Sequence, residues 1–324
     1  MKIFTKESLI ATLTAICNGP WLQSCKPPGN HGAVGNTLEK LLGIDENNLP
    51  LPNATEWELK GQRRGTSSLV TLFHLDPSPQ ALGLVNNLLI AKYGWPLENH
   101  PNEMSFRQTI TTVAPSDRGF QVIIDETEHK VMISFNANVV GERHQVWLQT
   151  VEQRVGLGQL NPQPYWGFDD LEYKAGTKLK NTFFVLAASK TQDGIEYFKY
   201  NGIIMLQTFG FEKFLEALRR GILKVDFDAR TGYNRRGHNH GTKFRIPANF
   251  LPIFYEQATT LFDTPLSREE RLKRLDIAEA RLIDEFDGAA RDGPTIVQFH
   301  SYEVKQVQKM PLKVAEQPEL DMEY

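Results

Sequence analysis

The stretch "PNATEWELKGQRRG", residues 52–65, contains a short alternation of charged and apolar side chains. Residues two apart in a β-strand share a face. Glu56, Glu58 and Lys60 should therefore line one side of a strand, and the intervening Trp and Leu the other. The apolar side can pack against a core. The stretch predicts a half-buried strand whose opposite face carries two carboxylates and an ammonium.

The composition of the whole chain sets wide bounds on what surrounds this strand. Its 324 residues, 40% of them hydrophobic, suffice for two domains, and a net charge of -3 neither demands nor excludes a nucleic-acid partner. Two cysteines, Cys17 and Cys25, do not make a disulfide framework, which favours a reducing cytoplasm. No apolar run approaches the roughly 18 residues of a membrane helix, so we expect no membrane partner.

Helices and strands alternate on both sides of residues 52–65. Residues 33–42 have helical spacing, with Gly43 as a glycine C-cap, and residues 69–75 should form a partner strand for the alternating one. Further strands are predicted at 120–126, 130–136, 182–190 and 197–209, and further helices at 81–94, 211–223 and 265–286. This mixture, without internal repeats, indicates an α/β (α+β) fold.

The pair Glu58 and Lys60 has a structural and a functional interpretation. A Glu-x-Lys spacing is common and can be a surface ion pair. With further oxygen ligands nearby, however, a carboxylate beside a lysine suits Mg²⁺-dependent phosphodiester hydrolysis, because the metal neutralises phosphoryl charge and acidifies water. Lys60 could hold and deprotonate that water or stabilise the transition state. Glu39, within an apolar helix, is either a boundary residue or a carboxylate aimed at this strand.

A second candidate region is the basic, glycine-punctuated run at residues 230–247, which contains no acid. Arg and Lys reach phosphates and guanine edges, so the run predicts DNA contacts, with a solvated basic loop as the alternative. Its candidate DNA-binding residues are Arg230, Arg235, Arg236, His238, His240, Lys243 and Arg245. Gln62, Arg63 and Arg64, directly after the alternating strand, are expected on the DNA backbone. The triplet His-Asn-His lacks a Cys or acid that would complete a zinc site.

Several quoted segments carry a resemblance in the same order along the chain. They are "NHGAVGNTLEKLLGI" (30–44), "NLPLPNATEWELKGQRRGTSSLVTLFH" (48–74), "LKNTFFVLAAS" (179–189), "EYFKYNGIIML" (196–206) and "RRGHNHGTKFRI" (235–246). Together they resemble the MvaI/BcnI restriction endonucleases, relatives of the mismatch-repair nickase MutH. The resemblance is weaker over the last seventy or so residues.

The resemblance implies a PD-(D/E)xK fold, with a central mixed sheet flanked by helices and two lobes around a DNA cleft. It implies a type II restriction enzyme that cleaves double-stranded DNA at specific sequences with Mg²⁺. It also implies a monomer, and a cognate DNA methyltransferase in the same system. On this basis we expect a catalytic lobe at 1–115, a DNA-recognition region at 116–250, and a C-terminal helical extension with an acidic tail at 251–324.

The resemblance also assigns residues. Glu58 matches the family's metal-binding glutamate, Lys60 its catalytic lysine, and Glu39 the helix glutamate of the MutH-like branch. Asn53 stands where the family has an acid. Asn53 could be a weaker, neutral metal ligand, it could mark an inactive form, or Glu56 could replace the missing acid.

Three other functions remain open from the sequence. The first is a MutH-like repair nickase, which needs a partner protein. The second is a DNA-binding protein without catalysis. The third is an unrelated α/β protein whose Glu-x-Lys strand is structural.

Overall fold

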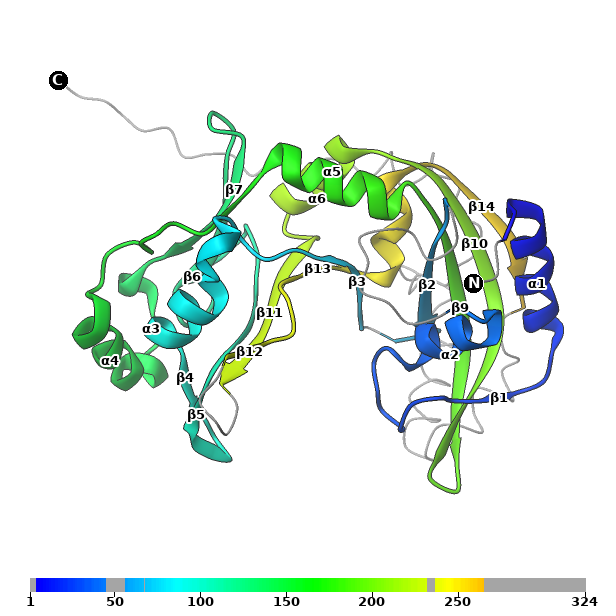
Figure 1. Cartoon of the computed structure of the whole chain (residues 1–324), viewed down its shortest axis with the longest axis horizontal. Helices are drawn as coiled ribbons and strands as arrows, with labels where there is room; N and C mark the ends of the chain where they lie inside the picture. Colours follow the sequence, from blue (N-terminus) through cyan, green and yellow to red (C-terminus); the bar gives the residue numbers. More distant parts are fainter. Residues whose placement is uncertain (1–3, 45–55, 67, 232–236, 265–324) are drawn as a thin grey trace, which may run out of the picture.

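The structure, a computed structural model, describes residues 4–44, 56–66, 68–231 and 237–264. These residues form a five-stranded, a six-stranded and a three-stranded sheet with helices around them, as Figure 1 shows. The predicted mixed α/β class is confirmed. Within the described ranges, no helix is both long and apolar enough to cross a membrane. The predicted helix over 265–286 and the acidic tail lie outside these ranges.

The alternating stretch belongs to the five-stranded sheet, in which the strand order is β1-β10-β9-β2 and β14 also pairs with β10. Its strands are β1 (Leu22–Gln23), β2 (Glu58–Arg63), β9 (Asn181–Gln192), β10 (Ile195–Phe209) and β14 (Tyr255–Asp263). Strand β2 runs parallel to β9, whereas the other pairings are antiparallel, so the sheet is mixed as predicted. The apolar runs of β9 and β10 are buried on both faces, which is typical of central strands.

Two N-terminal helices cover this sheet (Figure 1). Helix α1 (Lys6–Asn18) begins with a capping box between Thr5 and Ser8. Helix α2 (Ala33–Leu42) ends at Gly43, whose left-handed backbone (φ 68°) lets the Ile44 amide donate to the Glu39 carbonyl at 2.9 Å. The predicted glycine cap is therefore confirmed.

The other two sheets form the second half of the molecule. The six-stranded sheet contains β3 (Leu69–His74), β13 (Lys243–Pro247), β11 (Lys224–Thr231), β5 (His100–Ile110) and β4 (Trp95–Leu97), with β12 (Gly237–Asn239) on β11. The three-stranded sheet contains β6 (Phe120–Asp125), β7 (Lys130–Phe135) and β8 (Tyr165–Gly167). The expected pairing of residues 69–75 with the alternating strand is wrong, because β3 pairs with β13 and buries its apolar side chains in the other core.

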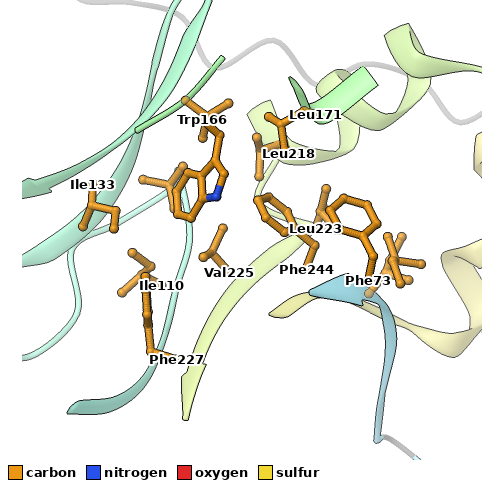
Figure 2. Close-up of a cluster of buried hydrophobic side chains, with 14 of the residues drawn as sticks. Phe73, Ile110, Ile133, Trp166, Leu171, Leu218, Leu223, Val225, Phe227 and Phe244 are labelled. Atoms are coloured by element: carbon orange, nitrogen blue, oxygen red, sulfur yellow. The ribbon is translucent and has the colours of Figure 1, made fainter. Parts of the chain in front are cut away.

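Helices and a large aromatic core join these sheets. The helices are η1 (Gln80–Leu82), η2 (Val85–Ile90), α3 (Ala91–Tyr93), η3 (Ala137–Val139), η4 (Glu142–His144), α4 (Gln145–Val155), α5 (Phe168–Leu179), α6 (Phe211–Arg219) and η5 (Ala248–Phe254). In Figure 2, Trp166 meets Phe244 edge-on, with ring centroids 5.3 Å apart. The six-stranded sheet uses strands from each side of the predicted boundary between residues 115 and 116, because β3, β4 and β5 precede it and β11 and β13 follow it.

One close approach fixes helix α2 on strand β2. A Cβ added to Gly61 would lie 2.8 Å from the backbone N of Gly35 and 3.1 Å from the carbonyl carbon of Val34. These are backbone atoms, which cannot move away as a flexible side chain can. Glycine at position 61 therefore allows the helix that carries Glu39 to lie directly on the strand that carries Glu58.

We expect Gly61→Ala to lower the free energy of unfolding by about 1–3 kcal/mol, because the added methyl overpacks this contact. Urea denaturation followed by circular dichroism measures the change. The matched control is Gly35→Ala, since a Cβ at Gly35 has open space around it. The control should be neutral, or stabilising by up to about 1 kcal/mol, because alanine favours a helix. Equal effects of the two substitutions would contradict the steric argument.

Candidate functional site

Glu58 is a buried carboxylate at the first position of β2. Only 2% of the residue is exposed, and in the parallel register it lies beside Thr182 of β9. A carboxylate at such a position is costly unless cations neutralise it. Lys60 supplies one of them, with Nζ 2.7 Å from Oε1. The predicted shared face of Glu58 and Lys60 is therefore confirmed.

The opposite face of this strand is apolar, as predicted. Trp57 and Leu59 are both buried, and the Trp57 ring lies 4.4 Å from that of Phe183, measured between centroids. Glu56 differs from the prediction: it is exposed in a turn ahead of β2, which begins two residues later. The strand face shared with Glu58 therefore does not extend to Glu56.

Lys60 connects the catalytic candidate to the other half of the molecule. Its Nζ donates a hydrogen bond to the carbonyl of Leu72 in β3, at 2.9 Å. An ammonium has three N–H donors, and these two contacts use two of them. Among the described residues, Lys60 is thus held in place while a donor remains for a further acceptor, such as a water molecule or a phosphate oxygen.

A second cation at Glu58 is one that the sequence did not reveal. Lys178 Nζ lies 3.0 Å from Oε2 of Glu58, and it comes from the last turn of α5. No local spacing links α5 to residues 52–65. The only signal was indirect: a carboxylate on a strand that is buried between apolar neighbours must attract cations from elsewhere in the fold.

Whether this site suits a metal ion depends on its oxygen donors. Glu58 Oε2 is buried and makes no hydrogen bond of good geometry with the part of the chain that the structure describes, despite the nearby Lys178, so it has lone-pair capacity left. Hard divalent cations prefer such carboxylate oxygens. The described residues contain no cluster of three or more His, Cys, Asp or Glu side chains that could hold a metal. Glu58 therefore fits as one ligand of a set that needs further oxygens.

Of the two other predicted ligands, Glu39 and Asn53, the structure describes only the first. Glu39 is half-buried on α2, one helical turn after Gly35, which contacts β2. The helix that carries Glu39 is therefore packed on the strand that carries Glu58. Asn53 lies outside the described residues. Together, Glu58, Lys60 and Lys178 carry one net positive charge, which suits an approaching phosphate.

The basic run forms part of a charged sheet face. On β11 the apolar residues point into the core, while Asp226, Asp228 and Arg230 occupy the alternate positions. Asp228 accepts from Lys243 at 2.9 Å, and Asp226 accepts from Arg245 at 3.1 Å. The acids that the run itself lacks thus come from the neighbouring strand.

Further ion pairs extend this face. Arg230 lies 3.7 Å from Glu103 of β5, and Arg107 lies 2.8 Å from Asp228. Although burial raises the pKa of Asp228, the hydrogen bond and charge of Lys243 outweigh it and hold that pKa below its usual value. Arg235 and Arg236 lie outside the described residues. The structure therefore partly neutralises the basic face instead of leaving it as free cations.

The two histidines of the run lie in β12 and directly after it, where the chain continues along β11 to β13. Their rings, His238 and His240, meet edge-on with centroids 4.4 Å apart. Asp76 holds this connection by accepting hydrogen bonds from Asn239 Nδ2 at 2.6 Å and from the Thr242 amide at 2.9 Å. Asp76, whose role the sequence did not indicate, therefore supports the connection between β12 and β13.

His74 ends β3 between the charged sheet face and the carboxylate site. Burial lowers its pKa from 6.5 to about 4, helped by the positive charges of Lys243 and Lys60. The residue is nevertheless exposed to solvent, so water screens part of this effect. His74 is therefore a neutral imidazole at pH 7, able both to donate and to accept a hydrogen bond.

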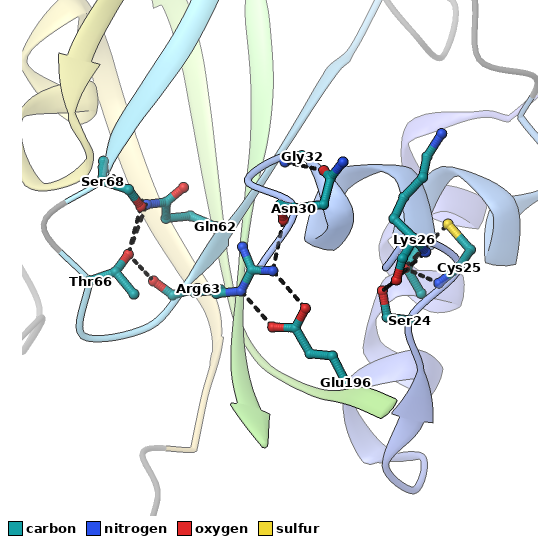
Figure 3. Close-up of polar contacts among 11 residues, drawn as sticks. Ser24, Cys25, Lys26, Asn30, Gly32, Gln62, Arg63, Thr66, Ser68 and Glu196 are labelled. Carbon is teal, nitrogen blue, oxygen red and sulfur yellow. Dashed lines mark hydrogen bonds and ion pairs between the residues drawn. The ribbon is translucent and has the colours of Figure 1, made fainter. Parts of the chain in front are cut away.

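Gln62 and Arg63, which the structure places at the end of β2 and not after it, and Arg64, which follows, have partners within the protein. Gln62 donates to Ser68 Oγ at 2.8 Å, and Arg63 makes two hydrogen bonds of 2.8 Å to Glu196 (Figure 3). Arg64 donates to Asp263 at 2.7 Å. These contacts join β2 to β10, β14 and the following loop. The expected DNA contacts of Gln62, Arg63 and Arg64 would compete with these internal bonds.

The chain is similar to one known protein family and to two solved structures. Residues 10–255 match the sequence model of the MvaI/BcnI restriction endonuclease family. The solved complex of restriction endonuclease MvaI with its cognate DNA substrate matches with a TM-score of 0.64 and 23% identity, over 79% of this chain and 99% of that chain. MvaI in the absence of DNA matches with a TM-score of 0.45 and 24% identity, over 81% of this chain and 100% of that chain.

No curated protein matches the sequence of this chain. The likeness to the MvaI complex shows that the predicted restriction-endonuclease fold is correct. The family match covers most of the chain and spans Glu58, Lys60 and the basic run. The chain therefore belongs to the MvaI/BcnI restriction endonuclease family and is a type II site-specific deoxyribonuclease.

Proposed function

We propose that this enzyme hydrolyses phosphodiester bonds of double-stranded DNA with Mg²⁺ at the Glu58 site. Restriction endonucleases generally use a divalent metal ion. The observation that carries the proposal is the buried Glu58 carboxylate. Lys60 Nζ lies 2.7 Å from its Oε1, and Oε2, although near Lys178, makes no well-aligned hydrogen bond within the described ranges. A bound Mg²⁺ would neutralise phosphoryl charge and acidify a water ligand. Glu58 and Asn53 would hold it, with Glu39 as a third candidate ligand.

The protein's own residues would carry the remaining steps. Lys60, fixed by Glu58 and the Leu72 carbonyl, would orient the attacking water through its remaining N–H and stabilise negative charge on the phosphate. The charged face of β11 and β13, with Arg230, Lys243 and Arg245, would contact DNA together with His238 and His240. We also propose that the enzyme acts as a monomer in the cytoplasm, beside a DNA methyltransferase that protects the host's sites.

The direct test is incubation of unmethylated plasmid and genomic DNA of diverse sequence with the purified protein and Mg²⁺. Discrete fragments that share one terminal sequence support the proposal, and EDTA should abolish them. Absence of cleavage on every DNA, at concentrations where the protein binds DNA, would refute it. Cleavage that appears only after addition of a partner protein would instead favour a repair nickase.

Asn53 supports a second candidate, a family member that binds DNA with a weakened metal site, because a neutral amide replaces an anionic ligand. We expect Asn53→Asp to lower the Mg²⁺ concentration for half-maximal cleavage on the order of tenfold, since cation affinity rises with ligand charge. Single-turnover rates across a Mg²⁺ titration measure this. Asn138→Asp, exposed in η3, adds the same charge as a control.

The two candidates give different outcomes in that experiment. If only the Asn53→Asp variant cleaves DNA, the natural chain is a binding protein. If both proteins cleave and the Mg²⁺ dependence is unchanged, Asn53 is not a metal ligand, and the site draws its oxygens from elsewhere.

The acids on the charged sheet face give a prediction about DNA affinity. Replacing Asp228 by Asn removes the partner of Lys243 and Arg107. We expect tighter non-specific DNA binding at low salt. The slope of the logarithm of the binding constant against the logarithm of the salt concentration should become steeper by roughly one, because a freed cation can displace a counterion. Fluorescence anisotropy without divalent metal measures both. Glu7→Gln, an exposed position on α1, removes equal charge and should change neither quantity.

A further inference from the structure

Lys178 is a second cation on a carboxylate that already has one. The side chains of Lys60 and Lys178 are 13% and 15% exposed, and that of Glu58 is 3% exposed. Lys60 comes from the same strand as Glu58. Lys178 reaches the carboxylate from α5, which follows β8 of the three-stranded sheet and precedes β9 of the five-stranded sheet (Figure 1).

Folding alone gives little reason for this second cation. One ammonium is enough to neutralise one carboxylate, and each further ion taken out of water adds a desolvation cost. Lys174, one turn earlier on α5, adds repulsion: burial and the charge of Lys178 lower its pKa. A lysine in the last turn does favour the helix dipole. That preference, however, is satisfied by a side chain pointing to solvent, and does not require a contact with Glu58.

The two lysines divide the two oxygens of Glu58 between them. Lys60 lies 2.7 Å from Oε1, and Lys178 lies 3.0 Å from Oε2. Oε2 is the oxygen without a well-aligned hydrogen bond, and therefore the oxygen with capacity for a further ligand. Lys178 thus restrains the plane of the carboxylate at the oxygen that a divalent cation would use.

We infer that Lys178 is a positioning residue of the active site, which orients the Glu58 carboxylate through Oε2 and competes there with the divalent cation. This inference rests on the proposed function of Glu58 as a metal ligand. It has two opposite consequences. Without Lys178, a cation should bind more tightly, because a neighbouring positive charge is gone. Cleavage should nevertheless be slower, because the carboxylate is no longer held in one orientation.

The test compares Lys178→Met and Lys178→Arg with the wild type. Mn²⁺ alone, without DNA, is titrated and its free concentration followed by electron paramagnetic resonance. Binding that is lost in Glu58→Gln defines the site. We expect Lys178→Met to bind Mn²⁺ about 10-fold more tightly, from removal of a repulsive charge a few ångströms away. Lys178→Arg should keep the wild-type affinity, because it restores the charge.

The same variants are then compared in single-turnover DNA cleavage at saturating Mg²⁺. We expect Lys178→Met to be slower by about 10- to 100-fold, because small misplacements of catalytic groups have effects of this size. Lys178→Arg should recover most of the rate. Lys180→Met, an exposed position directly after α5, serves as the matched control and should match the wild type in both measurements. Should Lys178→Met fail to fold, Lys178→Gln carries the same comparison.

Unchanged or weaker Mn²⁺ binding in Lys178→Met would overturn the inference, as would the absence of any Glu58-dependent Mn²⁺ binding. If the role of Lys178 were purely structural, Lys178→Met would lower the thermal stability and weaken cation binding together. Failure of the proposed function would be visible in a different measurement. If the wild type cleaves no DNA, the proposed function is wrong, and the Mn²⁺ comparison still decides whether Lys178 competes with a cation at Oε2.

Discussion

Single-turnover DNA cleavage should fall on the order of 10²- to 10³-fold or more in both Glu58→Gln and Lys60→Met, while DNA binding without cleavage stays close to that of the wild type. Glu58→Gln keeps the shape of the side chain but removes the anionic oxygen that neither lysine fully satisfies. Lys60→Met keeps the stem and removes the only ammonium that contacts both Glu58 and the Leu72 carbonyl in the described residues.

The measurement pairs cleavage at saturating Mg²⁺ with a gel-shift assay in EDTA, so that binding and chemistry are separated. The matched control is Glu56→Gln. Glu56 is a glutamate two residues before Glu58, but it is exposed in a turn. The Glu56→Gln variant should cleave DNA at a rate within about twofold of the wild type, because surface substitutions usually have small effects. A loss as large as that of Glu58→Gln would show instead that Glu56 replaces the acid absent at position 53. Full activity of Lys60→Met would contradict the proposed mechanism.

Local sequence patterns predicted the parts of this site whose geometry is local. The spacing of Glu58 and Lys60 placed them on one face of a strand, and they form an ion pair. The Gly43 cap of α2 was predicted in the same way, because its conformation depends on neighbours within one helical turn. The buried runs of β9 and β10 were recognisable from their apolar residues alone.

Contacts across long sequence separations could not be predicted in this way. Lys178 reaches Glu58 only because α5 leads back from the three-stranded sheet. The sequence showed that 230–247 is basic, but not that Asp226 and Asp228 of the adjoining strand would pair with it. The partner of β3 was wrongly predicted for the same reason, since strand order depends on the whole fold and not on adjacency in sequence.

Arg63 is the clearest example of a residue whose contacts could not be predicted from local sequence. Its removal should destabilise the protein more than any surface substitution. Its guanidinium makes two hydrogen bonds of 2.8 Å to Glu196 and one of 2.8 Å to the Asn30 carbonyl, as Figure 3 shows. The side chain of Arg63 is 15% exposed and that of Glu196 is 7% exposed, and the guanidinium lies 5.3 Å from the centre of the Phe198 ring. Position 63 was expected to follow the strand and contact DNA, but it is the last residue of β2, and its donors hold β2, β10 and the loop before α2 together.

We expect Arg63→Met to lower the free energy of unfolding by about 3–5 kcal/mol, because it leaves the Glu196 carboxylate buried without its cation. The double variant Arg63→Met/Glu196→Met should recover most of this loss, since no unpaired charge remains. Arg143→Met, which breaks the exposed pair with Asp117, should cost less than about 1 kcal/mol. Urea denaturation of the variants measures all three changes.

DNA binding by the double variant then separates the two roles of Arg63. A structural Arg63 predicts wild-type affinity and an unchanged salt dependence once stability is restored. A phosphate-contacting Arg63 predicts weaker binding and a salt slope shallower by roughly one, even in the stable double variant. Because Glu196 holds the guanidinium through both Nε and Nη2, we expect the first outcome. In that case the DNA contacts on this side of the site come from other residues, and Arg63 serves to keep Glu58 and Lys60 in register on β2.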